Sequence, residues 1–204
     1  MALQTPAAIP SEDTTPQSTP HTQIYSTVSG PLSGSSLGAL ERFAPVELIE
    51  RISEDWFERS HAIAPILYRR RYIRQLRDGL ADTNPVFCGL VISVCAATLS
   101  TLPRKNYAPV TLNRCISFID NYRLLPCGIS NPTCTVEYSI AMYNMGVAIS
   151  ALSPIGSRDL RAFHAVSESA TTTRYLLYCC MADLDFVDQQ LLKRLFWLLF
   201  AGAM

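Results

Sequence analysis

The stretch VFCGLVISVCAATLSTL, residues 86–102, decides the fold because nearly every side chain in it is apolar. A helix that is apolar around its whole circumference is covered by other elements on every side. Asn84 and Pro85 precede the stretch as a helix cap and a first-turn proline. Its apolar part, about 14 residues, is shorter than the roughly 20 residues that a bilayer requires. The sequence therefore predicts the central core helix of a helical domain, and no membrane span.

Apolar residues recur at helical spacing on both sides of this stretch, which predicts further helices. The expected segments are 45–60, 68–80, 110–125, 131–152, 158–180 and 185–204. Ser157 is the predicted N-cap of the helix that begins near residue 158. No segment alternates strictly between apolar and polar residues, and no Asn-Gly hairpin signal is present. The predicted fold class is all-α, an irregular multi-helix array.

The first 43 residues differ in composition from the rest and predict a disordered tail. Pro, Ser, Thr and Gly make up 21 of the first 40 residues, and the only charges among these 40 are Glu12 and Asp13. Such a segment buries too little apolar surface to offset its chain entropy. Ser36 lies in a Gly-x-Ser-x-Gly match, but a nucleophile elbow needs a strand before the serine and a helix after it, and neither is predicted. Residues 44–204 are expected to form one helical regulatory domain.

The charge pattern argues against direct DNA binding. The 17 basic and 17 acidic side chains balance, so the chain has no long-range field that attracts a phosphate backbone. Five arginines between residues 69 and 77 leave two interpretations open, phosphate contacts or a solvated helix face. The solvated face is favoured, since charge runs usually serve that end.

No catalytic, cofactor or metal site is predicted. The seven cysteines contain no Cys-x-x-Cys pair, which a zinc knuckle or a redox motif would ordinarily use, and they are expected to be reduced thiols. His61 and His164 lie among packing residues in predicted helices or at helix ends, and glycine-rich phosphate loops are absent. The chain is therefore not expected to be an enzyme.

Two motifs resemble a known family. The first, VELIERISEDWFERSHAIAPILYRRRYIRQL at residues 46–76, contains Phe57, His61 and a Pro65-Ile66-Leu67 sequence. The second, from residue 158 onward, contains Phe163 and His164, followed by Lys193, Arg194, Leu195, Phe196 and Trp197. In this order the motifs are similar to those of the fungal-specific transcription factor domain, the middle homology region of fungal zinc-cluster regulators.

The resemblance implies a regulator of transcription that acts through protein contacts in the nucleus. It implies interaction or family-motif roles for Phe57, His61, Pro65, Phe163, His164, Arg194, Phe196 and Trp197. No six-cysteine cluster precedes the motifs, so the family's sequence-specific DNA reading does not carry over. The family's domain continues past its Phe-Trp motif, so this chain is expected to be a truncated regulator, the front part of a larger helical domain.

The last predicted helix is apolar over most of its circumference. Leu191, Leu195 and Leu198 fall on one side, and Leu192, Phe196 and Leu199 fall on an adjoining side. We expect these side chains to need neighbours from a protein partner or from self-association. The alternative is a peripheral membrane protein held by this helix, although its terminal apolar block, residues 195–204, spans only about 15 Å, half of a hydrocarbon core.

Overall fold

The computed structural model describes residues 38–126, 133–152 and 159–202, all of which belong to one compact unit, residues 35–204. These residues form helices and no strand, which confirms the predicted all-α fold. The elements, in chain order, are α1 (Ala39–Phe43), α2 (Val46–Arg59), α3 (Arg69–Arg77), α4 (Leu80–Thr83), α5 (Pro85–Thr101), α6 (Leu112–Tyr122), α7 (Val136–Ser150), α8 (Leu160–Cys179), the short 3-10 helix η1 (Met181–Asp183) and α9 (Phe186–Gly202).

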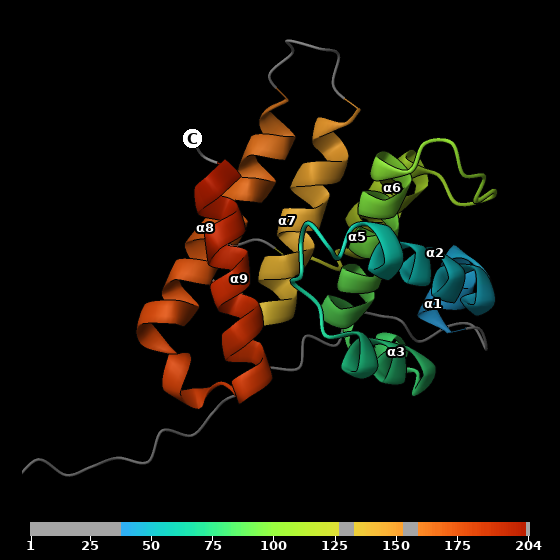
Figure 1. Ribbon diagram of the computed structural model, residues 1–204. Coiled ribbons are helices and arrows are strands. Elements are labelled where there is room, and N and C mark those ends of the chain that lie inside the picture. The colour runs from blue at the N-terminus through green and yellow to red at the C-terminus, as the bar shows by residue number, and fades with distance from the viewer. Residues whose placement is uncertain (1–37, 127–132, 153–158, 203–204) are drawn as a thin grey trace, which may run out of the picture. The chain divides into compact units, whose positions relative to one another are not determined.

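The predicted core helix is α5. All its residues from Phe87 to Thr98 are buried, and its neighbours are α2, α4, α6 and α7 (Figure 1). The helix begins as predicted, since the Asn84 side chain accepts a hydrogen bond from the Phe87 backbone N–H at 3.0 Å and Pro85 occupies the first turn. An apolar helix without a polar face thus organises the other helices around it.

The helices α7 and α8 approach closely because small side chains lie between them. Ser169 Oγ donates to the Ser139 carbonyl at 2.7 Å, and Ser139 Oγ lies 2.9 Å from Thr172 Oγ1. All three side chains are buried. At Gly146 there is no room for a side chain, since a Cβ added there would lie 2.5 Å from Val166 Cγ2 on α8. Hydroxyl pairs and a missing side chain therefore set the spacing of this helix pair.

The helices α8 and α9 form a hairpin joined through η1, and α9 also packs against α7 (Figure 1). Leu191, Leu192, Leu195 and Leu199 of α9 are all buried, between 0% and 9% exposed. The expectation that these leucines need neighbours from outside the chain is therefore wrong, since preceding helices of the same chain cover them. The side chains of α9 that remain in solvent are aromatic instead.

Several predicted helix boundaries differ from the structure. Residues 39–43, placed in the tail by the sequence, form α1, because Leu40 and Phe43 are buried. The segment 68–80 is divided between α3 and α4 at Gly79, whose φ of 71° is the left-handed conformation that glycine adopts without strain. Asp159 caps α8 by accepting from the Arg161 N–H at 2.9 Å.

Three predictions lie outside the described residues: the disordered tail over residues 1–37, Ser36 as an elbow match and Ser157 as a helix cap. Among the helices that the structure describes, none has both the length and the hydropathy that crossing a bilayer requires.

Replacing Gly146 with Ala is expected to destabilise the protein, because the new methyl group overlaps Val166 on α8. Overpacking costs about 1–3 kcal/mol, and the better helix propensity of alanine offsets about 1 kcal/mol of it. We expect the free energy of unfolding, measured by urea denaturation, to fall by up to about 2 kcal/mol. In a Val166→Ala background the overlap is gone, so Gly146→Ala is expected to be neutral or stabilising there. An equal loss in both backgrounds would contradict close packing at this position.

Candidate protein-interaction site

Arg71 ties the start of α9 to the rest of the fold. Its guanidinium, on α3, forms ion pairs with Asp188 and with Asp185, the latter at 3.0 Å, and lies 3.8 Å from Glu137 of α7. Burial lowers the pKa of Arg71, but Asp188, Glu137 and Asp185 together hold that pKa above its ordinary value. One cation therefore connects α3 to two helices that lie more than 60 residues further along the chain.

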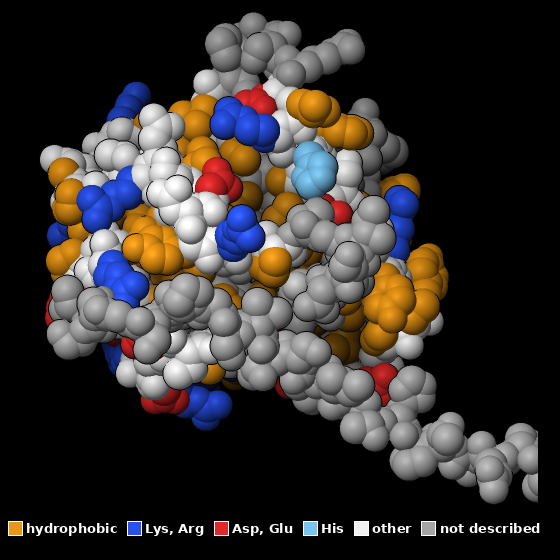
Figure 2. All heavy atoms as spheres, turned by 180° about the vertical axis from the view of Figure 1, so that it is seen from behind, with side chains coloured by type: hydrophobic (Ala, Val, Ile, Leu, Met, Phe, Trp, Pro, Cys, Tyr) orange, Lys and Arg blue, Asp and Glu red, His pale blue; other side chains and the backbone are white. Residues whose placement is uncertain are grey.

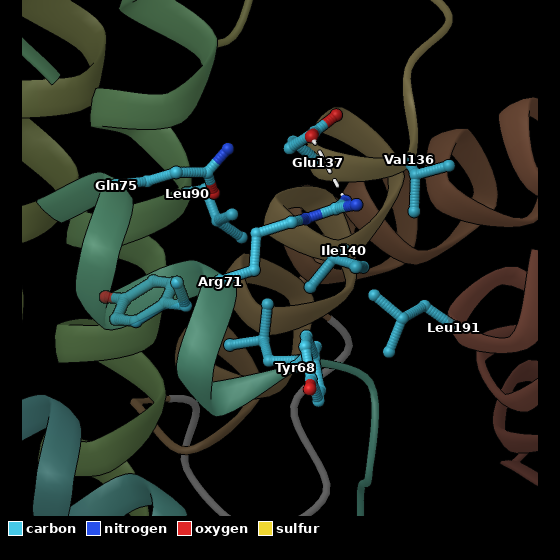
Figure 3. A pocket seen from close by; sticks show the side chains of 10 residues that line it. Tyr68, Arg71, Gln75, Leu90, Val136, Glu137, Ile140 and Leu191 are labelled. Carbon is cyan, nitrogen blue, oxygen red and sulfur yellow. Dashed lines mark ion pairs between the residues drawn. The ribbon is translucent and has the colours of Figure 1, made fainter. Parts of the chain in front are cut away.

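A small cavity lies beside this cation, between α3, α5, α7 and α9 (Figure 3). Figure 3 shows the Arg71 side chain extending from α3 toward Glu137, with Ile140 and Leu191 below it. The cavity volume is about 20 Å³. That is room for a water molecule, whereas sites for small organic ligands measure about 300–1,000 Å³. This position is a packed junction between helices, with no room for a metabolite.

The residues of the first motif lie where α2 ends. Phe57 is half-buried, and its ring lies 5.1 Å from Trp56 and 5.6 Å from both His61 and Tyr72, centre to centre. His61 Nε2 donates to the Leu67 carbonyl at 3.1 Å. The imidazole thereby closes the loop after α2 on itself. Phe57 and His61 thus have a structural role in this loop.

Besides the ion pairs of Arg71 with Asp185 and Asp188, a hydrogen bond joins the second motif to the first. Arg194 Nη1, on α9, donates to the Pro65 carbonyl at 3.2 Å, across 129 residues of sequence. The structure thus brings Pro65 and Arg194 together. Phe163 and His164 instead lie exposed on the outer side of α8.

Phe196 and Trp197 are at the far half of α9. Phe196 is half-buried, while Trp197 is 64% exposed. Trp197 lies edge-on to Phe196 and to Phe200, with ring centres 5.9 Å apart in both cases. An exposed aromatic row therefore follows the outer side of α9.

Large apolar side chains in solvent are concentrated on this hairpin. Eleven large hydrophobic side chains are exposed among the described residues, and seven of them belong to α8 and α9. We call these seven the α8–α9 face: Leu160, Phe163, Tyr175, Tyr178, Phe186, Trp197 and Phe200. Exposed apolar side chains project beside Lys or Arg at the right-hand edge of Figure 2, the side on which α8 lies in that view. Apolar patches of this kind mark interaction surfaces.

The sequence prediction found only part of this face. It named Phe163 and Trp197 from the motifs, but it missed Tyr175, Tyr178 and Phe186. The signal was present in α8, where small residues recur at helical spacing and are the ones that the structure buries. A helix that buries Ala, Ser and Thr presents its large residues on the opposite side.

Three cations on these helices lack an acidic partner among the described residues, and one of them, Arg194, donates to the Pro65 carbonyl instead. Arg174 and Lys193 are exposed, and neither takes part in the ion pairs of the described residues. Glu168 accepts from the Tyr138 hydroxyl at 3.5 Å, and Asp188 is paired with Arg71. The hairpin thus carries exposed aromatic side chains together with two cations that are not in an ion pair.

The arginine run of α3 is largely a solvated face, as favoured from the sequence. Arg69 pairs with Glu54, and Arg77 pairs with Glu50 at 2.9 Å. Arg70 and Arg74 are exposed as well. Arg71 is the exception, because its guanidinium turns inward to the helix junction.

The described cysteines are free thiols, six in number. Burial raises the pKa of Cys88 and of Cys115 to about 12 and holds the pKa of Cys95 well above its ordinary value. Cys179 is exposed. Among the residues that the structure describes, no three His, Cys, Asp or Glu side chains gather in a way that could hold a metal ion.

Comparison with known proteins finds no match, whether among protein-family models, curated proteins or solved structures. The likeness to the fungal regulators therefore rests on the two motifs alone.

Replacing Arg71 with Met is expected to weaken the attachment of α9, because Asp185, Asp188 and Glu137 then face one another without a cation. We expect the free energy of unfolding to fall by about 1–3 kcal/mol, as for the loss of a charged, partly buried hydrogen-bonded group. Arg70→Met, one residue earlier on the solvent side, is the control and should stay within about 0.5 kcal/mol of the parent. Equal effects of the two substitutions in urea denaturation would contradict this role.

Thiol labelling should divide the cysteines by burial. In a Cys127→Ser background, we expect Cys179 to react first with a water-soluble disulfide reagent at pH 8. Cys88, Cys95 and Cys115 should react only as fast as the protein unfolds, since burial keeps them out of reach and leaves almost no thiolate. Mass spectrometry of quenched samples gives the order. Early labelling of the three buried thiols would show that α5 and α6 are not packed as described.

Proposed function

We propose that the chain is a regulator of transcription, of the kind built on a fungal-specific transcription factor domain, that acts in the nucleus through protein contacts. The two motifs that resemble this family support the class. The single observation that carries the mode of action is the α8–α9 face, since it holds seven of the eleven exposed large apolar side chains of the described residues. The proposal involves no catalysis and no cofactor.

The composition of the face suits a protein partner. Trp and Tyr are among the residue types that contribute most to binding energy at interfaces. The backbone of Tyr175, Tyr178 and Trp197 is already fixed in helices, so a partner that covers these residues restricts only their side-chain rotamers. Direct DNA reading is outside the proposal, because the net charge is zero and three of the five α3 arginines are already in ion pairs.

Peripheral membrane binding is the second candidate, favoured by Trp197 and Phe200 beside Lys193. Against it, the leucines of α9 point into the protein, so the helix has no continuous apolar face for lipid. Flotation of the full chain with liposomes separates the two functions, since the proposed regulator stays in the dense fraction.

A tethering assay tests the regulator role directly. The full chain, fused to an unrelated DNA-binding module, is expected to change transcription of a reporter relative to the module alone. Trp197→Ala combined with Phe200→Ala should remove most of this change, because losing two interface aromatics costs about 2–4 kcal/mol of binding, more than tenfold in affinity.

Tyr122→Ala, which removes an exposed aromatic from α6, is the matched control and should keep the reporter effect. Immunoblotting establishes equal amounts of each fusion. If the parent fusion neither activates nor represses the reporter, the proposed function is wrong.

A further inference from the structure

We propose that the α8–α9 face binds an amphipathic helix of a partner protein whose apolar stripe is accompanied by acidic residues. This inference rests on the proposed function, since it names the chemistry of the protein contact. It is argued from the order of aromatic and charged side chains along the hairpin, and from what the acidic side chains nearby already bind.

The hairpin presents apolar groups at both ends and cations between them. Phe186, Lys193 and Phe200 are seven residues apart on α9, so they follow one side of the helix over about 21 Å. On α8, which runs in the opposite direction, Tyr178 lies near the turn, Arg174 lies about 6 Å further on, and Phe163 lies toward the other end. The length of this row corresponds to about four turns of a partner helix.

Charge complementarity selects an acidic partner. Arg174 and Lys193 have no acidic partner among the described residues. Of the acidic side chains nearby, Asp188 is paired with Arg71, Glu168 accepts from the Tyr138 hydroxyl, and Asp183 lies exposed at the turn, on η1. An incoming carboxylate thus meets two cations that need not give up an acidic partner in order to pair with it. An incoming ammonium group would meet like charge.

Two other occupants fit this pattern less well. A second copy that docks through the same face about a two-fold axis would add another Arg174 and Lys193 to an interface that already contains these two cations, and like charges are repulsive there. An anionic membrane gains only about 1 kcal/mol for each basic residue near its surface, and the face offers two such residues without an acidic partner. A helical protein segment satisfies both the aromatic ends and the cationic middle.

The exposed tryptophan supplies the test. Trp197 is 64% exposed and Trp56 only 1%, so a shift of the emission of the full chain to shorter wavelength reports on the α8–α9 face. The probes are two synthetic 16-residue helical peptides with the same Leu and Phe positions, one with Glu and the other with Lys at the remaining polar positions. The Glu peptide is expected to shift the emission and the Lys peptide to leave it unchanged. Trp197→Phe should abolish the signal.

Charge reversal gives the decisive comparison. Arg174→Glu with Lys193→Glu is expected to raise the Kd for the Glu peptide about tenfold and to create binding of the Lys peptide. Arg70→Glu with Arg74→Glu, which reverses two exposed arginines on α3, is the matched control and should leave both results as in the parent.

Several results would overturn the inference. The first is equal binding of the two peptides. The second is an emission shift with rising protein concentration in the absence of peptide, which would show that a second copy of the chain covers the face. The third is a shift caused by phosphatidylcholine–phosphatidylserine vesicles alone, which would show that the face binds lipid. If peptide binding fails while the tethered chain still changes reporter transcription, only the partner chemistry is wrong. If the peptide binds but the reporter does not respond, the regulator role is wrong and the docking face stands.

Discussion

The constraint on which the fold depends is that α5 has no polar side. Every residue from Phe87 to Thr98 is buried, so the chain has to supply cover around the whole circumference of this helix. It does so with helices from both halves of the sequence, α2 and α4 from before it and α6 and α7 from after it. Burying an apolar side chain fully is worth about 1.5–3 kcal/mol, so no neighbour of α5 can leave without a large loss of stability.

The secondary structure was largely predictable from the sequence, because the signals for the start and the apolar side of a helix are local. The apolar spacing within residues 45–60 predicted α2, and Asn84-Pro85 predicted the start of α5, because both signals are local in the sequence. The same reasoning was wrong for the leucines of α9. Periodicity shows that a face is apolar, but it does not show whether a neighbour comes from the same chain, and here α7 and α8 supply it.

The junction at Arg71 was beyond prediction for a related reason. The sequence favoured one solvated face for all five arginines between residues 69 and 77, and four of them are exposed. Arg71 instead binds Asp185 and Asp188, more than 110 residues further along the chain. Only the docking of α9 selects that guanidinium from its neighbours. Likewise, nothing local predicts that Arg194 donates to the Pro65 carbonyl, a second contact between the two motifs.

On α8, the side chains that pack against the core and the side chains that remain in solvent lie on opposite sides of the helix. Its inner side consists of small residues such as Ala162, Ser169 and Thr172, which allow α7 to approach closely. Its large residues, Phe163 and Tyr178 among them, are therefore directed outward, where they contribute little to stability. If α8 were selected for packing alone, these outer positions would tolerate any polar residue. Core packing therefore gives no reason for aromatic side chains there, and a partner that covers them does.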